Sequence, residues 1–168
     1  MHASFRRSLA IALTAMALLA PVVALADGSV HVALTAQRVT EVNGHEVLLS
    51  AEKARPGEVL EYRAVYRNDT GTAVRQLMAT LPIPNGLEYL PRTAAPAQVL
   101  ASLDGQSFAP VPLVRTQRMA DGHEVVREVP PSEYRFLRWS IGALGVKQSR
   151  TVAARVRVAP LALATLTH

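Results

Sequence analysis

Apolar and polar side chains alternate along residues 56–69, a stretch that begins at Pro56-Gly57 and ends in polar turn residues. One side of this stretch would carry Leu60, Tyr62, Ala64 and Tyr66. The other side would carry Glu61, Arg63 and Arg67. Successive side chains of a β-strand point to opposite faces of the sheet, so a period of two is typical of a strand with one buried face. The stretch therefore predicts a half-buried strand of an antiparallel sheet.

Similar patterns recur along the rest of the chain. They predict further strands at residues 30–35, 47–51, 72–81, 87–90, 99–103, 106–108, 113–119, 123–129, 134–141 and 151–158. The alternation is clear at residues 151–158 and blurred at residues 72–81. Outside the first 26 residues, no segment keeps a 3.6-residue apolar period over the roughly 10–12 residues that indicate a helix.

Turn residues separate the predicted strands. Asn43-Gly44, Asp104-Gly105 and Asp121-Gly122 each lie between two strand patterns. A two-residue type I′ turn needs positive φ at both central positions, which such pairs tolerate, so we expect three β-hairpins. Asn68-Asp69-Thr70-Gly71 is expected to end the strand at residues 56–69. It also matches the Asn-x-Thr pattern of a glycosylation acceptor, but we interpret it as a turn.

About eight or nine short strands with turns between them predict an all-β fold, an immunoglobulin-like antiparallel β-sandwich. We expect one such domain at residues 27–160, followed by a C-terminal tail at residues 161–168. Removing the first 26 of the 168 residues leaves 142, an ordinary size for a single core. The chain has no cysteine, which excludes disulfides and cysteine metal sites.

The first 26 residues have the features of a cleavable signal peptide. Arg6 and Arg7 precede an apolar run at residues 9–20, and Ala24-Leu25-Ala26 supplies the small residues of a cleavage site. We therefore predict export to the periplasm or the cell exterior. The alternative is an uncleaved membrane anchor, for which the run is shorter than the roughly 18–20 residues that span a bilayer. No later segment is apolar enough to span a membrane.

The charge of the cleaved chain is small and dispersed. It would carry 16 Lys and Arg against 13 Asp and Glu, a net charge of +3, which predicts no nucleic-acid partner. Arg63 and Arg67, and separately Arg155 and Arg157, have the spacing of outward residues on two predicted strands. If those two faces lie side by side, the four arginines would form a basic strip able to contact a phosphate or carboxylate polymer.

Five motifs occur in the order found in one known family. They are PGEVLEY at residues 56–62, Asn68, LPIPNGLEY at residues 81–89, SLDGQSF at residues 102–108 and LRW at residues 137–139. Together they resemble the conserved-repeat domain of exported bacterial surface proteins, the domain of unknown function numbered eleven. The resemblance covers residues 30–158. It implies an immunoglobulin-like sandwich of the cell envelope, serving as a spacer or adhesive module, and it implies no catalytic residues.

The residue types that support catalysis or metal binding do not have the necessary spacing. The histidines after the leader are His31, His45, His123 and His168. None of them lies two or four residues from another, so we interpret them as exposed residues rather than metal ligands. No serine lies in a G-x-S-x-G turn. Glu58 and Glu61 would point to opposite faces, and Glu124 and Glu128 would lie roughly 13 Å apart, too far for a retaining glycosidase. We predict no catalytic, metal or cofactor site.

Most of the aromatic residues fall at positions expected to face inward. They are Tyr62, Tyr66, Tyr89, Tyr134, Phe136 and Trp139. We interpret them as core residues rather than as a platform for stacking carbohydrate.

These patterns favour a non-catalytic, exported structural or interaction module of the bacterial cell envelope. It would act by docking to an envelope protein or by strand-edge pairing, because open sheets leave unpaired N–H and C=O groups at their edges. The first strand or the tail after Pro160 would supply the edge. Two alternatives stay open: a small envelope enzyme or enzyme accessory subunit, and a weak polyanion-binding domain that uses the four arginines.

Overall fold

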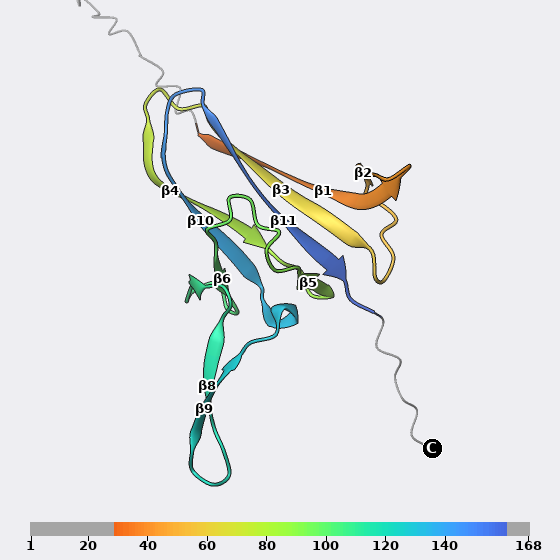
Figure 1. Ribbon diagram of the computed structural model, residues 1–168. Coiled ribbons are helices and arrows are strands. Elements are labelled where there is room, and N and C mark those ends of the chain that lie inside the picture. Colours follow the sequence, from red (N-terminus) through yellow and green to blue (C-terminus); the bar gives the residue numbers. More distant parts are fainter. Residues whose placement is uncertain (1–28, 161–168) are drawn as a thin grey trace, which may run out of the picture.

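The computed structural model describes residues 29–160, which form two antiparallel sheets and a separate hairpin (Figure 1). The first sheet has the strand order β2-β1-β3-β11-β5, the second has the order β4-β10-β6-β7, and β8 pairs with β9. The bounds are β1 Val30–Val42, β2 His45–Ser50, β3 Val59–Asn68, β4 Val74–Pro82, β5 Leu87–Tyr89, β6 Leu100–Ser102, β7 Ala109–Pro110, β8 Val114–Arg118, β9 Glu124–Glu128, β10 Phe136–Leu144 and β11 Ser149–Val158, with a 3₁₀ turn η1 at Pro131–Glu133. The predicted signal peptide and the tail at residues 161–168 lie outside the described residues.

The two sheets pack face to face around one core. Strand β3 contacts β4, and β11 contacts β10, so the central strands of the first sheet face two strands of the second. Leu60 and Ala64 from β3 are buried together with Leu137 and Trp139 from β10. The predicted antiparallel β-sandwich is confirmed.

Strand β3 has the predicted alternation, with one exception to the predicted burial. Leu60, Ala64 and Tyr66 are buried, whereas Tyr62 on the same face is half-buried. The second sheet lies over β3 and β11 but leaves the inner face of the neighbouring β1 exposed, so Tyr62 keeps one side open. Partial burial still raises the pKa of the Tyr62 hydroxyl.

The predicted aromatic core is confirmed for Tyr66, Tyr89, Tyr134 and Trp139, while Phe136 is half-buried like Tyr62. The rings of Tyr89 and Tyr134 stack with their centroids 6.0 Å apart. The Trp139 indole N–H donates a hydrogen bond of 2.7 Å to the carbonyl oxygen of Pro96. Buried aromatic rings with a satisfied polar group contribute strongly to a core.

Two of the three predicted hairpins are confirmed. Val42 lies opposite His45, and the two residues between them, Asn43 and Gly44, have φ of +54° and +76°, as a type I′ turn requires. The hairpin of β8 and β9 closes around Asp121-Gly122, where the Met119 N–H donates to the His123 carbonyl oxygen. It extends away from the sandwich (Figure 1).

In the third predicted hairpin, around Asp104-Gly105, the two flanking strands pair antiparallel, but the predicted turn and return strand are wrong. Strand β6 ends at Ser102, its partner β7 begins at Ala109, and residues 106–108 form no strand. The Asp104 carboxylate accepts hydrogen bonds from the backbone N–H groups of Gln106 (2.8 Å) and Ser107 (2.9 Å). These side-chain bonds occupy the groups that a return strand would use, so the chain forms a longer loop.

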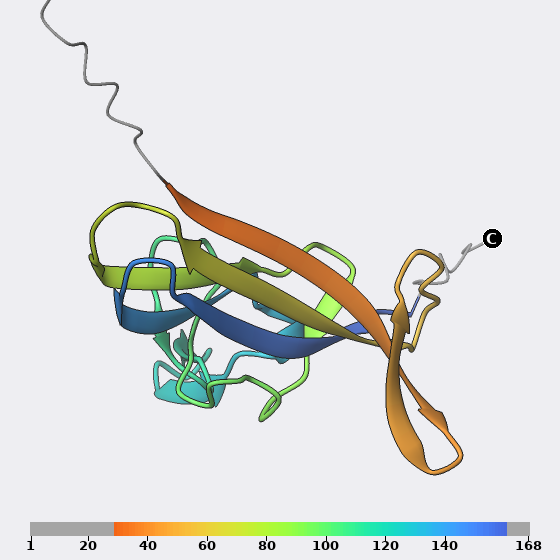
Figure 2. The same cartoon turned by 90° about the horizontal axis from the view of Figure 1, so that it is seen from above.

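The first strand is longer than predicted. Residues 30–35 form only the beginning of β1, which continues without a break to Val42. Its first part pairs with β3 alone, and its second part also pairs with β2. The hairpin of β1 and β2 projects beyond the body of the sandwich (Figure 2).

The turn predicted after the central strand is confirmed, and Asn68 organises it. The Asn68 side chain is fully buried. Its amide nitrogen donates to the carbonyl oxygens of Thr72 (2.8 Å) and Leu144 (2.9 Å), and its oxygen accepts from the Thr70 backbone N–H (2.9 Å). Because the amide is buried and bonded within the protein, we interpret Asn68 as a structural residue and not as a glycosylation acceptor.

Within residues 29–160, the structure contains no helix long and apolar enough to cross a membrane.

Candidate functional site

The four arginines of the predicted basic strip lie on the outer face of the first sheet. Strand pairing places Arg155 opposite Glu61 and Arg63 opposite Ala153, so the two strands bring their arginines close together. Carboxylates lie between them, however. Glu61 accepts a hydrogen bond of 2.6 Å from Arg63 and lies 3.5 Å from Arg155, which also forms a two-pronged pair with Glu46.

The other two arginines differ from each other. Arg67 donates to the Asp69 carboxylate at 3.0 Å, and the Lys147 ammonium group contacts the same carboxylate at 3.1 Å. These two cations lower the pKa of Asp69. Arg157 is exposed, and no carboxylate partner is found for it among the described residues. The outer face is therefore a mixed-charge surface, and its binding of a polyanion stays a prediction.

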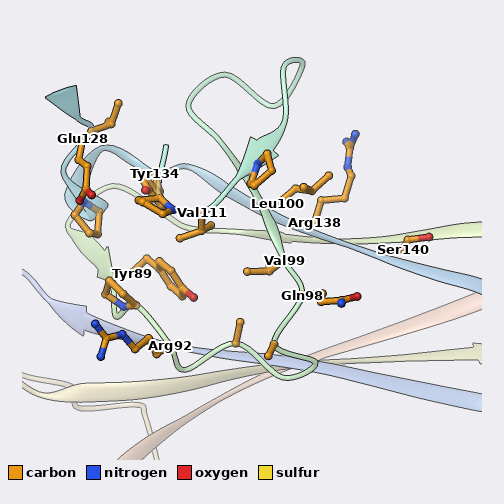
Figure 3. Close-up of a pocket in the computed structure, with 17 residues that line it drawn as sticks. Tyr89, Arg92, Gln98, Val99, Leu100, Val111, Glu128, Tyr134, Arg138 and Ser140 are labelled. Carbon is orange, nitrogen blue, oxygen red and sulfur yellow. The ribbon is translucent and has the colours of Figure 1, made fainter. Parts of the chain in front are cut away.

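A cavity with a volume of about 1030 Å³ lies beside β6 and the loop at residues 91–99 (Figure 3). Its lining includes Tyr89, Tyr134, Val99 and Val111. The labelled polar side chains are Arg92, Gln98, Glu128, Arg138 and Ser140, and they are spread around the rim instead of meeting at one point (Figure 3). General acid–base or nucleophilic catalysis needs convergent groups within hydrogen-bond reach, so we assign no chemistry to this cavity.

Histidine and carboxylate side chains do not gather into a metal site. Within residues 29–160, no three of them come close enough together to hold an ion.

The edges of the sheets differ in how they are protected. An unprotected edge presents N–H and C=O groups to a further strand, and proteins block such edges with charges, prolines, bulges or covering groups. Strand β4 forms one edge of the second sheet. The Tyr66 hydroxyl donates to the Thr80 carbonyl oxygen (3.1 Å) and accepts from the Thr80 N–H (3.0 Å). This hydroxyl satisfies both backbone groups of Thr80 and closes the β4 edge there.

The same strand is also distorted further along. Gln76 has a φ of +55°, and the pairing of β4 with β10 shifts register at Gly142. A bulge of this kind bends a strand away from regular pairing. At the opposite edge, β7 consists of two residues and includes Pro110, which has no N–H to donate. Both edges of the second sheet are therefore closed to a long added strand.

The other described edges are short or charged. Strand β5 has three residues, and the chain that follows it continues to cover β11 through a bridge between Ala95 and Ala153. Strand β2 has six residues, and its Glu46 forms a salt bridge with Arg155 of β11. Strands β8 and β9 carry charged residues along both strands.

The first part of β1 is the exception. From Val30 to Gln37 the chain contains no Asp, Glu, Lys or Arg. Pairing with β2 begins at Gln37, so residues 30–36 have a described partner strand only on the β3 side. This segment, residues 30–36, is called the open edge below. Figure 2 shows it as the rim of the first sheet.

The direction of the backbone groups in the open edge follows from the ladder. The Ser29 carbonyl oxygen accepts a hydrogen bond from the Asp69 N–H, so Ser29 is bonded toward β3. In an antiparallel pair, residues bonded toward one neighbour alternate with residues directed away from it. The N–H and C=O groups of Val30, Val32 and Leu34 therefore point away from β3, toward the free side.

The side chains of these residues lie on the inner face of the sheet. Val32 lies opposite Tyr66 and Leu34 lies opposite Ala64, and both of those β3 residues are buried. Yet Val32 is 54% exposed and Leu34 is 48% exposed, because the second sheet does not cover β1. Within residues 29–160, the open edge thus combines backbone groups directed away from its one partner strand with uncovered apolar side chains, which is what strand addition requires.

Comparison with models of known families, with curated proteins and with solved structures finds no match to this chain. The family resemblance drawn from the five motifs therefore stays a prediction.

Sequence reasoning named the first strand as one candidate edge, and the structure places its first part at an open edge. The other candidate, the tail after Pro160, lies outside the described residues. The contact of Tyr66 with Thr80 was missed. The only signal in the sequence was an inward tyrosine, which any core position could hold.

Proposed function

We propose that the protein is a non-catalytic, exported interaction module that binds an extended protein strand along the open edge. The observation that carries this proposal is the contrast between edges: one uncharged edge presents free backbone groups beside apolar side chains, whereas the other described edges are closed, short or charged. Main-chain hydrogen bonds would supply affinity, and the uncovered Val32 and Leu34 side chains would favour apolar residues in the added strand.

A photo-crosslinking experiment in the producing cells tests this proposal. Benzoylphenylalanine replaces Val32 in one variant and Thr151 in a matched control, because Thr151 is an exposed residue of β11 on the outer face. We expect a discrete adduct after irradiation from position 32 and none from position 151.

A second substitution shows whether the adduct depends on strand addition. Leu34→Lys places a charge on the uncovered inner face, and Thr35→Lys places the same charge one residue later, on the outer face. The adduct should fall by about tenfold with Leu34→Lys, a loss typical of a buried charge, and change little with Thr35→Lys. Absence of any adduct from position 32, or equal loss with the two lysines, would refute the proposal.

An enzyme or accessory subunit is the competing class. A panel of esterase, glycosidase and peptidase substrates distinguishes it from the proposal. Turnover that a single polar substitution abolishes would indicate an enzyme. We expect none, because the polar groups around the described cavity do not converge.

A further inference from the structure

We propose that the strand received by the open edge is the open edge of a second copy of this chain. Two copies would pair antiparallel about a twofold axis, so that their five-stranded first sheets become one continuous sheet. This inference rests on the proposed function and names its partner.

The open edge is suited to pairing with itself because it contains no Asp, Glu, Lys or Arg. In a twofold pair, residues near the axis meet copies of themselves or of their close neighbours. Any charged residue there would face a like charge, which is destabilising across strands. Residues 30–37 contain no Asp, Glu, Lys or Arg, so this repulsion does not arise.

The directions of the backbone groups select one register. Ahead of the segment that pairs with β2, Val30, Val32, Leu34 and Ala36 direct their N–H and C=O groups to the free side, and Ala36 adjoins the first residue that pairs with β2. Pairing Val32 with the partner's Val32, and Val30 with the partner's Leu34, uses Val30, Val32 and Leu34 in both copies and leaves Ala36 outside the pairing. Moving the axis to Ala33 would instead pair Val30 with Ala36, the residue next to the start of β2 pairing. The twofold axis therefore passes through Val32.

The same register joins apolar side chains. Residues directly opposite on paired strands place their side chains on the same face. Val32 would contact the partner's Val32, and Leu34 would contact the partner's Val30, all on the uncovered inner face. Aliphatic side chains that are half exposed in the single copy would thus lose part of their exposure.

There is room for the second copy in the plane of the sheet. Strand β2 begins to pair only at Gln37, and the second sheet contacts β3 and β11. The open edge lies on the rim of the molecule with nothing described beside it (Figure 2).

Single cysteines test both the pairing and its register, since the chain has no cysteine of its own. Val32→Cys places the thiol on the axis, where Cα atoms of a bonded antiparallel pair lie roughly 5.5 Å apart, within disulfide range. Ala33→Cys is the matched control. In this register its two copies are diagonal neighbours, roughly 7–8 Å apart, at or beyond the limit for a disulfide.

The experiment uses the full chain, purified as its own cells process it and treated with a mild oxidant. We expect Val32→Cys to form a covalent dimer about ten times faster than Ala33→Cys. Without cysteine, the wild-type chain should sediment as a dimer at about 100 µM, Leu34→Lys should sediment as a monomer, and Thr35→Lys should remain a dimer.

Equal oxidation rates at the two positions, or a wild-type monomer at that concentration, would overturn the pairing. The two proposals can fail separately. If the wild-type chain is a monomer while position 32 still crosslinks a different protein in cells, the second copy is excluded and strand addition stands. If position 32 crosslinks nothing, strand addition fails as well.

Discussion

Replacement of Asn68 by alanine should be among the most destabilising changes of a polar residue in this protein. The side chain is fully buried and joins three parts of the chain: the end of β3, the turn at residues 70–72 and the turn between β10 and β11. The substitution removes the amide but leaves the backbone bonds of residue 68 in place, such as the one from its N–H to the Gln148 carbonyl oxygen.

The expected magnitude follows from the groups left without partners. The Leu144 carbonyl oxygen is bonded to Asn68 in a buried position, and losing that bond should cost about 1–3 kcal/mol. The bonds to Thr72 and Thr70 are partly buried, so water can replace them in part, at about 0.5–1 kcal/mol each. The sum is about 3 kcal/mol, a large share of the stability of an ordinary domain.

Urea unfolding followed by tryptophan fluorescence measures this loss, since Trp139 is the one tryptophan of the chain and is buried. Asn85→Ala is the matched control, because Asn85 is an exposed asparagine in a turn. We expect the control to change the free energy of unfolding by less than about 0.5 kcal/mol. If Asn68→Ala lies within about 1 kcal/mol of the wild type, the account of this network is wrong.

Other perturbations test the core, the closed edge and the acid response. Trp139→Ala should lower the free energy of unfolding by about 3–5 kcal/mol, and Tyr62→Ala should lower it by clearly less because Tyr62 is half-buried. Equal losses in urea unfolding would contradict the burial found for the two rings. Tyr66→Phe should cost about 1 kcal/mol and make the protein more prone to aggregate, visible by light scattering, because the Thr80 backbone groups lose their partner. Backbone N–H groups lower the pKa of Asp104, so the ionised carboxylate stabilises the fold above the unfolded pKa of about 4, and this stabilisation is lost as the pH falls below that value. Asp104→Asn should therefore lessen the acid-induced fall in the thermal midpoint. An equal fall in the variant and the wild type would contradict the role of this carboxylate. Finally, the outer face of the first sheet should give little salt-dependent retention on heparin, since carboxylates pair with most of its arginines.

Local signals in the sequence were sufficient for the alternation of the central strand and for one turn type. The alternation at residues 60–66 depends on one strand and one buried face, and the Asn43-Gly44 turn depends on two residues that tolerate positive φ. Both features are decided within a few residues of the chain, so both could be predicted. The Asp104-Gly105 pair shows the limit of such reasoning. The same dipeptide serves a tight hairpin or a loop held by its carboxylate, and the choice depends on neighbouring backbone groups.

The candidate site was less accessible to sequence reasoning, because an edge is defined by the order of strands in a sheet. The charge-free run at residues 30–37 can be seen in the sequence, but it would be equally compatible with a central strand. Neither β2 nor the second sheet covers the first part of β1. This exposure depends on contacts between segments that are distant in the sequence. The burial of Tyr62 was overestimated for the same reason.

The hydroxyl of Tyr66 also limits how large an assembly can become. A building block with two joinable borders can add units at both ends and grow into a fibre. Here one oxygen atom occupies the border of β4 at Thr80, which would leave the open edge as the border for the proposed pairing among the described residues. Under the proposed pairing, growth by strand addition would stop at a closed pair.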